Sequence, residues 1–392
     1  MPRTRPPVSQ SLHDVARRFV GHDPTLGIER LGAGLINATY RVDSAQGSFV
    51  LQRINEAVFP APEHIMSNLS RLHAMATARQ ELGVRLPTPR PAADGAAFVR
   101  ACDGGIWRMM EYVSPSRTLS EVQNPVQASE IGRALGRFHR LGSHLDPVDM
   151  QVALPGLHHT PGYRAELDQT LAMTVHQVSA PGADARVTDA LAFIETRTAL
   201  VRVLEDAVRA GLTTTRVIHG DPKLDNLLFD QANDRVLCLI DLDTVQPGLL
   251  HHDIGDCLRS CCNRAGEATD GGIAIQFDLD VCRGILAAYG AETRGLLTTA
   301  EMDLIYPCIR LIPFELGIRF LTDHLRGNRY FRVTAAGDNL GKALGQFALV
   351  ADIERKAKSI EAIVARCFPC ERTTERSNGA SSQGNRDAQP AI

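Results

Sequence analysis

The stretch Val217-Ile-His-Gly-Asp-Pro-Lys-Leu-Asp-Asn-Leu-Leu-Phe229, followed by Arg235-Val-Leu-Cys-Leu-Ile-Asp-Leu-Asp-Thr244, decides the fold. Each stretch contains a short apolar run of strand length, and the turn-forming residues 230–234 separate the two runs. An antiparallel hairpin places the start of its first strand beside the end of its second strand. Asn226 and Asp241 lie at these two ends, so we expect their side-chain oxygens to lie close together at the same end of the hairpin.

Polar residues in this hairpin and in the loop before it suit phosphoryl transfer from a metal–nucleotide complex. Asp241 and Asn226 offer hard oxygen ligands to Mg²⁺, which keeps several waters and bridges substrate phosphates. Asp221 can orient an acceptor hydroxyl and take its proton, and Lys223 can neutralise charge on the transferred group. Asp243 follows the metal aspartate closely and is a candidate second metal ligand, a sugar contact or an acceptor for nearby backbone amides.

His219-Gly-Asp-x-x-x-x-Asn226, followed by Ile240-Asp-x-Asp243, resembles the aminoglycoside phosphotransferase/choline kinase family, which has a protein-kinase-like fold. Further segments resemble the bacterial N-acetylhexosamine 1-kinases: Gly34–Tyr40, Phe49–Asn55, Asp253–Asp256 and Leu316–Asp323. The resemblance implies a kinase that uses ATP and Mg²⁺ to phosphorylate the anomeric hydroxyl of an N-acetylhexosamine. The alternatives are a kinase of another small alcohol (a different sugar, homoserine or an aminoglycoside) and a nucleotide-binding regulatory protein without turnover.

The resemblance also implies an α+β fold of two lobes, a small antiparallel-sheet N-lobe and a larger, mainly helical C-lobe. We expect an N-terminal extension or helix in residues 1–26, the N-lobe with the hinge at its end in 27–112, and the C-lobe in 113–370. Residues 371–392 have almost no apolar content, which predicts a disordered tail. Apolar spacing predicts helices over 62–82, 130–141, 278–289, 299–325 and 338–363.

Composition and charge favour a soluble cytoplasmic enzyme. A chain of 392 residues is long enough for two lobes. Its net charge of −3 and pI near 6.5 give no reason to expect nucleic acid or an anionic membrane as a partner. No apolar stretch approaches the roughly 20 residues that span a bilayer, and the first residues lack the apolar core of a secretory signal. Nine scattered cysteines, an odd number, fit a reducing compartment.

The N-lobe residues that would hold ATP depart from the usual kinase pattern. Gly34 and Asn37 lie in a turn expected to cover the phosphates, although this turn lacks the full three-glycine spacing. The strand that should carry a phosphate-holding lysine has Gln52 and Arg53 instead, and alternation lets only one of them point into the cleft. Because a guanidinium can contact phosphate bidentately, we predict that Arg53 takes this role, with Glu63 as its partner.

The run Trp107–Val113 is apolar and strand-like, and it ends at a Ser-Pro-Ser turn. We interpret it as the hinge between the lobes, where backbone groups of Glu111 and Tyr112 would hold the adenine. The alternative is a plain edge strand.

The expected acceptor segment, Glu301–Arg332, carries charges of both signs. An aminoglycoside would call for an acidic surface, and choline would call for an aromatic cage around its ammonium group. A neutral sugar fits better, because arginine and tyrosine can hydrogen-bond hydroxyl and amide oxygens. The resemblance points to Arg319, Tyr330 and Asp323 as sugar contacts. On the residues alone, Arg319 could equally pair with Glu315, one helical turn away.

Two predictions concern the support of the catalytic loop. His139 lies beside the apolar face of a helical segment, where a buried, hydrogen-bonded histidine is expected. Asp253 and Asp256 begin a later helical segment and are expected to tie the catalytic loop in place through backbone N–H groups.

Overall fold

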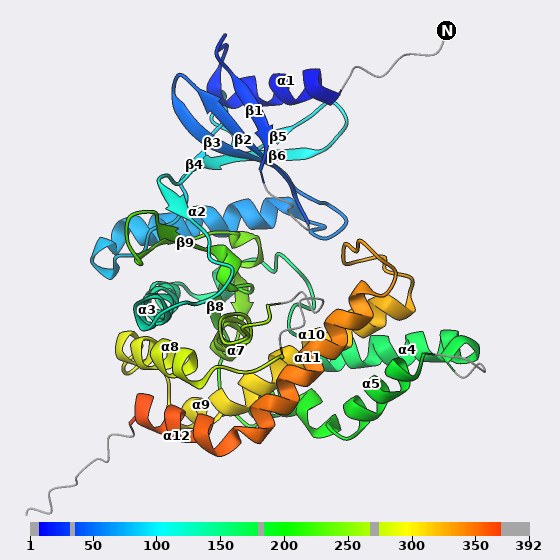
Figure 1. The fold of residues 1–392 in the computed structure, drawn as a ribbon. Coiled ribbons are helices and arrows are strands. Elements are labelled where there is room, and N and C mark those ends of the chain that lie inside the picture. The colour runs from blue at the N-terminus through cyan, green and yellow to red at the C-terminus, as the bar shows by residue number, and fades with distance from the viewer. Residues whose placement is uncertain (1–7, 32–35, 179–183, 267–273, 370–392) are drawn as a thin grey trace, which may run out of the picture.

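The computed structural model describes residues 8–31, 36–178, 184–266 and 274–369, and it shows two lobes (Figure 1). The small N-lobe is an antiparallel sheet with helix α1 packed on it, and the larger C-lobe is mainly helical. The predicted α+β, kinase-like fold is therefore confirmed. The tail predicted over residues 371–392 lies outside the described residues. In the described part of the chain, no helix is long and apolar enough to cross a membrane.

The N-lobe sheet has the strand order β1-β2-β3-β6-β4, with β5 also pairing β6, and every pairing is antiparallel. Its strands are β1 (Gly27–Arg30), β2 (Ala38–Ser44), β3 (Gly47–Arg53), β4 (Pro89–Arg90), β5 (Val99–Arg100) and β6 (Ile106–Glu111). Helix α1 (Val8–Val20) buries Val15 and Phe19 in one cluster with Leu51 and Met109, which lie on one face of the sheet. The opposite face is therefore left for the C-lobe.

Side-chain alternation in β3 and β6 decides which residues turn toward the C-lobe. Leu51 and Met109 belong to the cluster with α1, whereas their sequence neighbours Gln52, Arg108 and Met110 line a cavity between the lobes. Gln52 and Arg108 are direct cross-strand partners. The cleft face of the sheet thus carries this polar pair, with Thr39 of β2 bonded to Gln52, among apolar residues.

Helix α2 (Pro62–Ala78) forms where a helix was predicted and connects the two lobes. Pro62 takes the first turn, where its missing N–H would have no helical partner. The helix buries an apolar stripe at three- and four-residue spacing: Ile65, Leu69 and Leu72. From the same helix, Asn68 Nδ2 donates to the carbonyl oxygen of Val245 at 2.8 Å. This bond fixes the N-lobe helix to the segment that follows the predicted metal aspartate.

The C-lobe helices are α3 (Pro125–Gly142), α4 (Thr160–Val178), α5 (Ala185–Glu195), α6 (Val203–Arg209), α7 (Leu250–Cys261), α8 (Leu279–Glu292), α9 (Thr299–Asp303), α10 (Ile305–Leu325), α11 (Asp338–Arg355) and α12 (Ala357–Cys367). Its strands are β7 (Ser116–Arg117), β8 (Arg216–Ile218), β9 (Leu227–Asp230), β10 (Val236–Leu239) and β11 (Gln246–Gly248). The predicted helices are confirmed, although the last two predicted segments each form two helices, α9 with α10 and α11 with α12.

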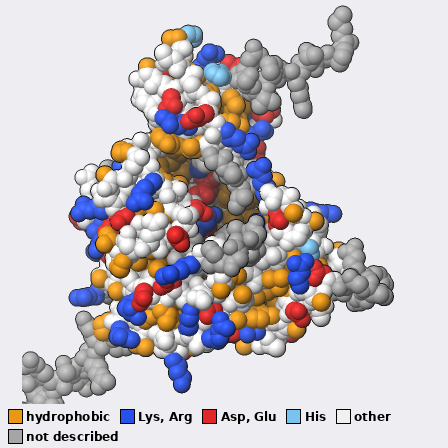
Figure 2. Space-filling view, viewed as in Figure 1, with side chains coloured by type: hydrophobic (Ala, Val, Ile, Leu, Met, Phe, Trp, Pro, Cys, Tyr) orange, Lys and Arg blue, Asp and Glu red, His pale blue; other side chains and the backbone are white. Residues whose placement is uncertain are grey.

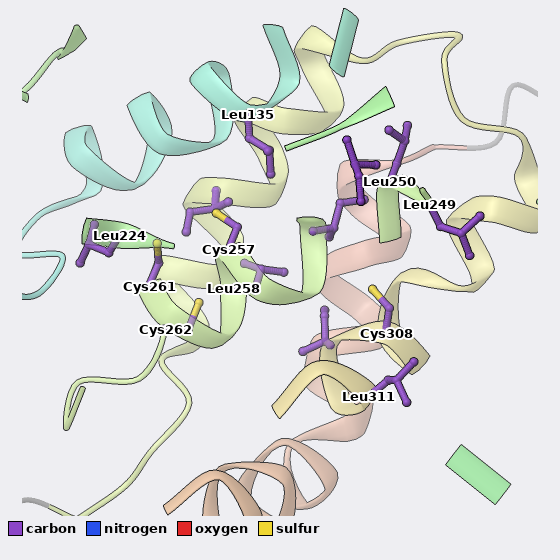
Figure 3. Close-up of a cluster of buried hydrophobic side chains, with 14 of the residues drawn as sticks. Leu135, Leu224, Leu249, Leu250, Cys257, Leu258, Cys261, Cys262, Cys308 and Leu311 are labelled. Atoms are coloured by element: carbon purple, nitrogen blue, oxygen red, sulfur yellow. The ribbon is translucent and has the colours of Figure 1, made fainter. Parts of the chain in front are cut away.

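Helix α7 lies in the middle of the C-lobe core (Figure 3). It contributes cysteines and leucines to a buried cluster with α3 and α10: Leu135, Cys257, Leu258, Cys261 and Cys308. Leu224, from the loop before the hairpin, is buried in the same core, and its N–H donates to Ser260 Oγ of α7 at 3.0 Å. The core therefore supports the predicted catalytic loop directly.

Candidate active site

A cavity of about 1060 Å³ lies between the two lobes, and Figure 2 shows the hollow from one face. The N-lobe sheet and the hinge form one side, and the catalytic loop, α10 and the loop after α10 form the other. Most predicted site residues line it: Asn37, Glu111, Tyr112, Asp221, Lys223, Asn226, Asp241, Asp243, Arg319 and Tyr330. Of the predicted residues that the structure describes, Arg53 and Asp323 are outside the lining. Gly34 lies outside the described residues.

The predicted hairpin is confirmed and brings its two polar ends together. Strand β9 pairs antiparallel with β10, and Leu227 lies opposite Leu239. Just beyond this pair, the N–H of Ile240 donates to the carbonyl oxygen of Asn226 at 2.9 Å. Because Asp241 follows directly, the side chains of Asn226 and Asp241 both start at the cavity end of the hairpin.

The predicted catalytic residues form one hydrogen-bonded group in the cavity. Lys223 Nζ donates to Asp221 Oδ2 at 2.9 Å, and Asn226 Nδ2 donates to the same oxygen at 3.0 Å. Asn226 Nδ2 also donates to the main-chain oxygen of Asp221 at 2.7 Å. The amide nitrogen of Asn226 is therefore used within the loop, which leaves its amide oxygen for a metal.

Asp241 has an unusual backbone conformation and an unusual electrostatic environment. Its φ of 61° and ψ of 53° are left-handed, a conformation that non-glycine residues rarely adopt and that clusters at functional sites. Its carboxylate opens onto the cavity, yet the surrounding protein desolvates it. This desolvation, together with the charges of Asp243 and Asp221, raises the pKa of Asp241 to about 7. The charges of Lys223 and Arg108 offset this rise in pKa only in part.

The side chains of Asn226 and Asp241 are suited to coordinate a magnesium ion. Mg²⁺ binds one or two protein oxygens and takes its remaining ligands from water and substrate phosphates. Asp241 offers a carboxylate whose negative charge the nearby cations balance only in part, and Asn226 offers an amide oxygen beside it. Within the described ranges, no group of three His, Cys, Asp or Glu side chains could hold an ion alone. A magnesium ion here would therefore depend on the nucleotide for much of its coordination.

Asp253 of α7 anchors the catalytic loop, as predicted. Its two carboxylate oxygens accept from the N–H groups of His219 and Gly220 at 2.7 and 2.8 Å. His139, buried and hydrogen-bonded as predicted, contacts Asp253 Oδ2 through Nε2 at 2.9 Å. Burial alone would raise the pKa of Asp253, but these bonds and the neighbouring charge of His139 lower it. Asp256 differs from the prediction, since its Oδ1 accepts from Arg259 Nε of the same helix at 2.8 Å.

A family model described as the phosphotransferase enzyme family (APH) matches residues 27–289, about two thirds of the chain. The chain belongs to this family. Solved structures also resemble this phosphotransferase over most of its length. The microcompartment-associated aminopropanol kinase matches with a TM-score of 0.60 and 20% identity, over 89% of this chain and 98% of that one.

Two further solved structures show the same fold. Spectinomycin phosphotransferase, solved with ADP and spectinomycin, matches with a TM-score of 0.57 and 14% identity, over 91% of this chain and 100% of its own. Choline kinase from Cryptosporidium parvum matches with a TM-score of 0.56 and 12% identity, over 92% of this chain and 100% of its own. At these identities the likeness establishes the fold of the phosphotransferase and leaves its acceptor open.

In the phosphotransferase, Asp243 joins the segment after Asp241 to the N-lobe, and these contacts argue against its predicted role as a metal ligand. Its Oδ2 accepts from Asn37 Nδ2 at 2.7 Å, and its Oδ1 pairs with the guanidinium of Arg108. Arg108 also donates to Gln52 Oε1 from Nε at 3.1 Å and from Nη2 at 2.7 Å. The side chains of Arg108 and Asp243 are 3% and 2% exposed. Arg108 therefore neutralises Asp243, and Asn37 binds the second oxygen of this carboxylate.

The prediction that Arg53 holds phosphate is wrong. Alternation in β3 turns Gln52 into the cavity and Arg53 away from it, where Arg53 pairs with Asp103 at 3.0 Å on the surface. Glu63, its expected partner, pairs with a different arginine. The buried cation on the cleft face is Arg108, which the sequence interpretation missed. An arginine inside an apolar strand was the available signal, because arginine is rarely fully buried without a partner.

The hinge residues lie where β6 ends and the chain enters the C-lobe (Figure 1). Strand β6 has partners on both sides, so the alternative of an edge strand is wrong. The Glu111 carboxylate accepts from Arg85 at 2.9 Å and from Thr88 Oγ1 at 3.2 Å, and the Glu111 N–H donates to the carbonyl oxygen of Thr88 at 2.7 Å. The N–H of Tyr112 donates to the carbonyl oxygen of Ser48 at 3.2 Å. Adenine binding by this segment remains a prediction.

Arg319 of α10 lines the cavity and lies among aromatic rings. Its guanidinium carbon is 4.8 Å from the ring centre of Tyr163, 5.4 Å from that of Phe331 and 5.8 Å from that of Tyr330. The alternative ion pair between Arg319 and Glu315 is not formed, because the Glu315 carboxylate is bonded to other residues. The guanidinium therefore faces the cavity with its N–H donors available.

The prediction that Asp323 contacts the acceptor is also wrong. Asp323 is buried, and its Oδ1 accepts from the N–H groups of Arg329 and Tyr330, both at 2.8 Å. Its Oδ2 accepts from the N–H of Phe331 and from Asn339 Nδ2, both at 2.9 Å. Asp323 thus shapes the loop that presents the Tyr330 ring, and it reaches the acceptor only through that loop.

A buried ion pair connects the catalytic loop with α10. His158 Nδ1 lies 3.0 Å from Glu315 Oε1, and its Nε2 lies 3.1 Å from the carbonyl oxygen of Gly220. Thr160 Oγ1 donates to the second oxygen of Glu315 at 2.6 Å. Both ring nitrogens of His158 face acceptor atoms, and the neighbouring Glu315 raises the pKa of the ring, which favours its doubly protonated, positively charged form. The sequence interpretation missed this pair, whose members are 157 residues apart.

Proposed function

We propose that this phosphotransferase transfers the γ-phosphoryl group of ATP to the anomeric hydroxyl of an N-acetylhexosamine, with Mg²⁺ as cofactor. The observation that carries the proposal is the placement of Arg319 among the rings of Tyr163, Tyr330 and Phe331. Its N–H groups can donate to hydroxyl and amide oxygens, and the rings offer apolar faces to a sugar. The family membership supports the coarser statement, that the protein is a small-molecule phosphotransferase.

The loop residues provide the chemistry of this proposal. Asp221 would orient the acceptor hydroxyl and take its proton as the new oxygen–phosphorus bond forms, while ADP leaves with the electrons of the broken bond. Lys223, 2.9 Å from Asp221, would neutralise charge on the transferred group. Mg²⁺ held by Asp241 and Asn226 would neutralise the nucleotide phosphates. Closure of the lobes would exclude water, which would otherwise consume ATP.

Cationic acceptors fit this cavity less well. By their names, two of the similar structures act on aminopropanol and choline. An ammonium group calls for a carboxylate or for an open aromatic cage. Here the aromatic cluster already contains Arg319, and the carboxylates of Glu315 and Asp323 are hydrogen-bonded to protein groups. Acceptors without a positive charge are therefore favoured.

Product analysis across an acceptor panel tests the proposal. The purified protein is incubated with ATP, Mg²⁺ and one acceptor at a time, and products are detected by mass spectrometry. The panel holds N-acetylglucosamine, N-acetylgalactosamine, glucose, galactose, kanamycin, choline and homoserine. We expect a 1-phosphate of an N-acetylated sugar, assigned by NMR. Phosphate on kanamycin, choline or homoserine alone would reject the acceptor class and keep the catalytic assignment.

A matched pair of variants separates catalysis from nucleotide binding. Asp221→Asn removes the proton acceptor and should lower kcat by at least about 10²-fold, the lower end of the contribution of general bases. ATP binding, measured by calorimetry, should change little in this variant. Asp206→Asn alters an exposed carboxylate on α6 outside the cavity lining and should retain activity. Unchanged turnover in Asp221→Asn would reject the mechanism and favour the regulatory alternative.

A further inference from the structure

Three cationic side chains line the acceptor half of the cavity. They are Arg319 of α10, Arg332 of the loop after α10, and Lys342 of α11. Among the described residues, no carboxylate lies within ion-pair distance of any of the three. Arg332 and Lys342 also have no part in the transfer of the phosphoryl group described above.

Three carboxylates on α10 and α11, the helices that carry Arg319 and Lys342, are hydrogen-bonded to other groups. Glu315 accepts from His158, and Asp323 accepts from the backbone of the loop that follows α10. Asp338, one turn before Lys342, accepts from the N–H groups of Thr334 at 2.6 Å and Ala335 at 2.9 Å. None of these three carboxylates, all in the described part of the chain, forms an ion pair with Arg319, Arg332 or Lys342.

The cations are arranged around a pair of aromatic rings. The Phe320 and Phe331 ring centres are 4.5 Å apart. Lys342 Nζ lies 5.6 Å from the Phe320 ring centre, and the Arg319 guanidinium lies 5.4 Å from the Phe331 ring centre. Arg332 follows Phe331 directly in the chain. Positive groups thus border an apolar surface at one end of the cavity.

We propose that the acceptor carries an anionic group, a carboxylate or a phosphate ester, and that Arg332 and Lys342 bind this group. Arg319 is then free to contact the sugar hydroxyls and amide. This inference rests on the proposed function and narrows its acceptor to an acidic derivative of an N-acetylhexosamine. Charge-assisted hydrogen bonds to such a group are stronger than neutral ones, and an anion would supply the partner that Arg332 and Lys342 lack among the described residues.

Three acceptors that share one sugar ring test the inference: N-acetylglucosamine, its 6-phosphate and its 3-O-lactyl ether, which carries a carboxylate. We expect kcat/KM for one of the two anionic acceptors to exceed that for the neutral sugar by at least about tenfold. The anionic acceptor that is preferred identifies the group as phosphate or carboxylate. The preference should shrink as ionic strength rises, because salt screens exposed charges.

Two variants test whether Arg332 and Lys342 cause the preference for an anionic acceptor. Arg332→Gln combined with Lys342→Gln should reduce the ratio of kcat/KM between the anionic and the neutral acceptor toward one. Arg329→Gln is the matched control, because Arg329 is an exposed arginine in the same loop that does not line the cavity. The control should keep the wild-type ratio. If the double variant folds poorly, the kcat/KM values that the wild-type protein shows for the three acceptors still test whether an anionic group is preferred.

The results distinguish a failure of the anionic-acceptor inference from a failure of the proposed function. Equal kcat/KM values for the three acceptors would overturn the inference and leave the proposed function standing. A double variant that raises KM for ATP with every acceptor would assign these cations to the nucleotide and would also overturn it. If ATP binds but none of the three acceptors yields a product, the proposed function fails, and this inference fails with it.

Discussion

Replacing His158 by Gln removes one half of the buried ion pair between the catalytic loop and α10. The Glu315 side chain is 2% exposed, so its carboxylate would remain in the protein interior without a counter-charge. Glutamine can donate to one of the two acceptors that His158 bonds, but its amide oxygen would face the other. Removing one partner of a buried ion pair costs about 3–5 kcal/mol, and we expect a loss of this size at pH 6.

The effect should depend on pH because both partners titrate. Burial alone would lower the pKa of His158, but the hydrogen bond and the charge of Glu315 raise it above its ordinary value of 6.5. Burial alone would raise the pKa of Glu315, but His158 lowers it below 4.5. The other groups that face His158 are Asp256 and the stacked ring of His252 on α7, and the carbonyl oxygen of Gly220.

The directions of these two pKa shifts define the pH range in which the ion pair stabilises the protein. A histidine whose pKa is raised by folding stabilises the protein fully below pH 6.5, and this contribution is lost as pH rises through the folded-state value. A glutamate whose pKa is lowered stabilises the protein above pH 4.5, and this contribution is lost as pH falls through the folded-state value. The difference between wild type and His158→Gln should therefore be largest between pH 4.5 and 6.5 and should decrease at alkaline pH.

Urea unfolding at several pH values between 5 and 9 measures this difference. His144→Gln is the control, because His144 is exposed and its replacement should leave the free energy of unfolding nearly unchanged. The double variant His158→Gln with Glu315→Gln should be more stable than the sum of the single losses predicts, since it leaves no unpaired charge. A loss below about 1 kcal/mol at pH 6, as in exposed pairs, or a loss independent of pH, would refute the reasoning.

Three other substitutions test separate parts of the structure. Arg108→Met should leave Asp243 buried without its partner and destabilise the protein by about 3–5 kcal/mol in urea unfolding, and adding Asp243→Leu should restore part of this loss. Asp241→Asn should abolish the Mg²⁺-dependent part of ATP binding, measured by calorimetry with and without the metal, while ATP binding without Mg²⁺ persists. Gly132→Ala should lower the melting temperature through a loss of at least about 1–3 kcal/mol, because its Cβ would overlap the carbonyl oxygen of Ile285 where α3 crosses α8.

The catalytic loop and its hairpin could be predicted because their geometry is local. Asp221, Lys223 and Asn226 are five residues apart at most, and the hairpin that brings Asp241 beside them closes within fifteen residues of Asn226. Their hydrogen bonds follow from spacing and from the antiparallel pairing. The anchoring role of Asp253 was predictable for a similar reason, since a helix start brings polar residues close to an adjacent loop.

The contacts that escaped prediction join distant parts of the chain. Which of Gln52 and Arg53 enters the cavity depends on which face of the sheet helix α1 covers, and the local sequence does not specify that choice. Asp243 pairs with Arg108 from a strand 135 residues earlier, and this ion pair occupies the carboxylate that was predicted to bind a metal. The role of Asp323 depends on the path of the loop that folds back over it, which no periodic pattern encodes.

Gly220 shows how these long-range contacts serve the catalytic aspartate that follows it. Its N–H donates to the Asp253 carboxylate at 2.8 Å, and its carbonyl oxygen accepts from the charged ring of His158 at 3.1 Å. The Asp253 carboxylate thus binds the N–H of Gly220 and the His158 ring binds its carbonyl oxygen. Together the two contacts fix the orientation of the backbone at this residue. Its φ is 85°, and a Cβ at this position would lie 2.6 Å from the Thr244 carbonyl oxygen, so the position requires glycine. Because His158 also binds Glu315 of α10, one turn before Arg319, the helix that carries the acceptor contacts and the loop that carries Asp221 are positioned by the same ion pair.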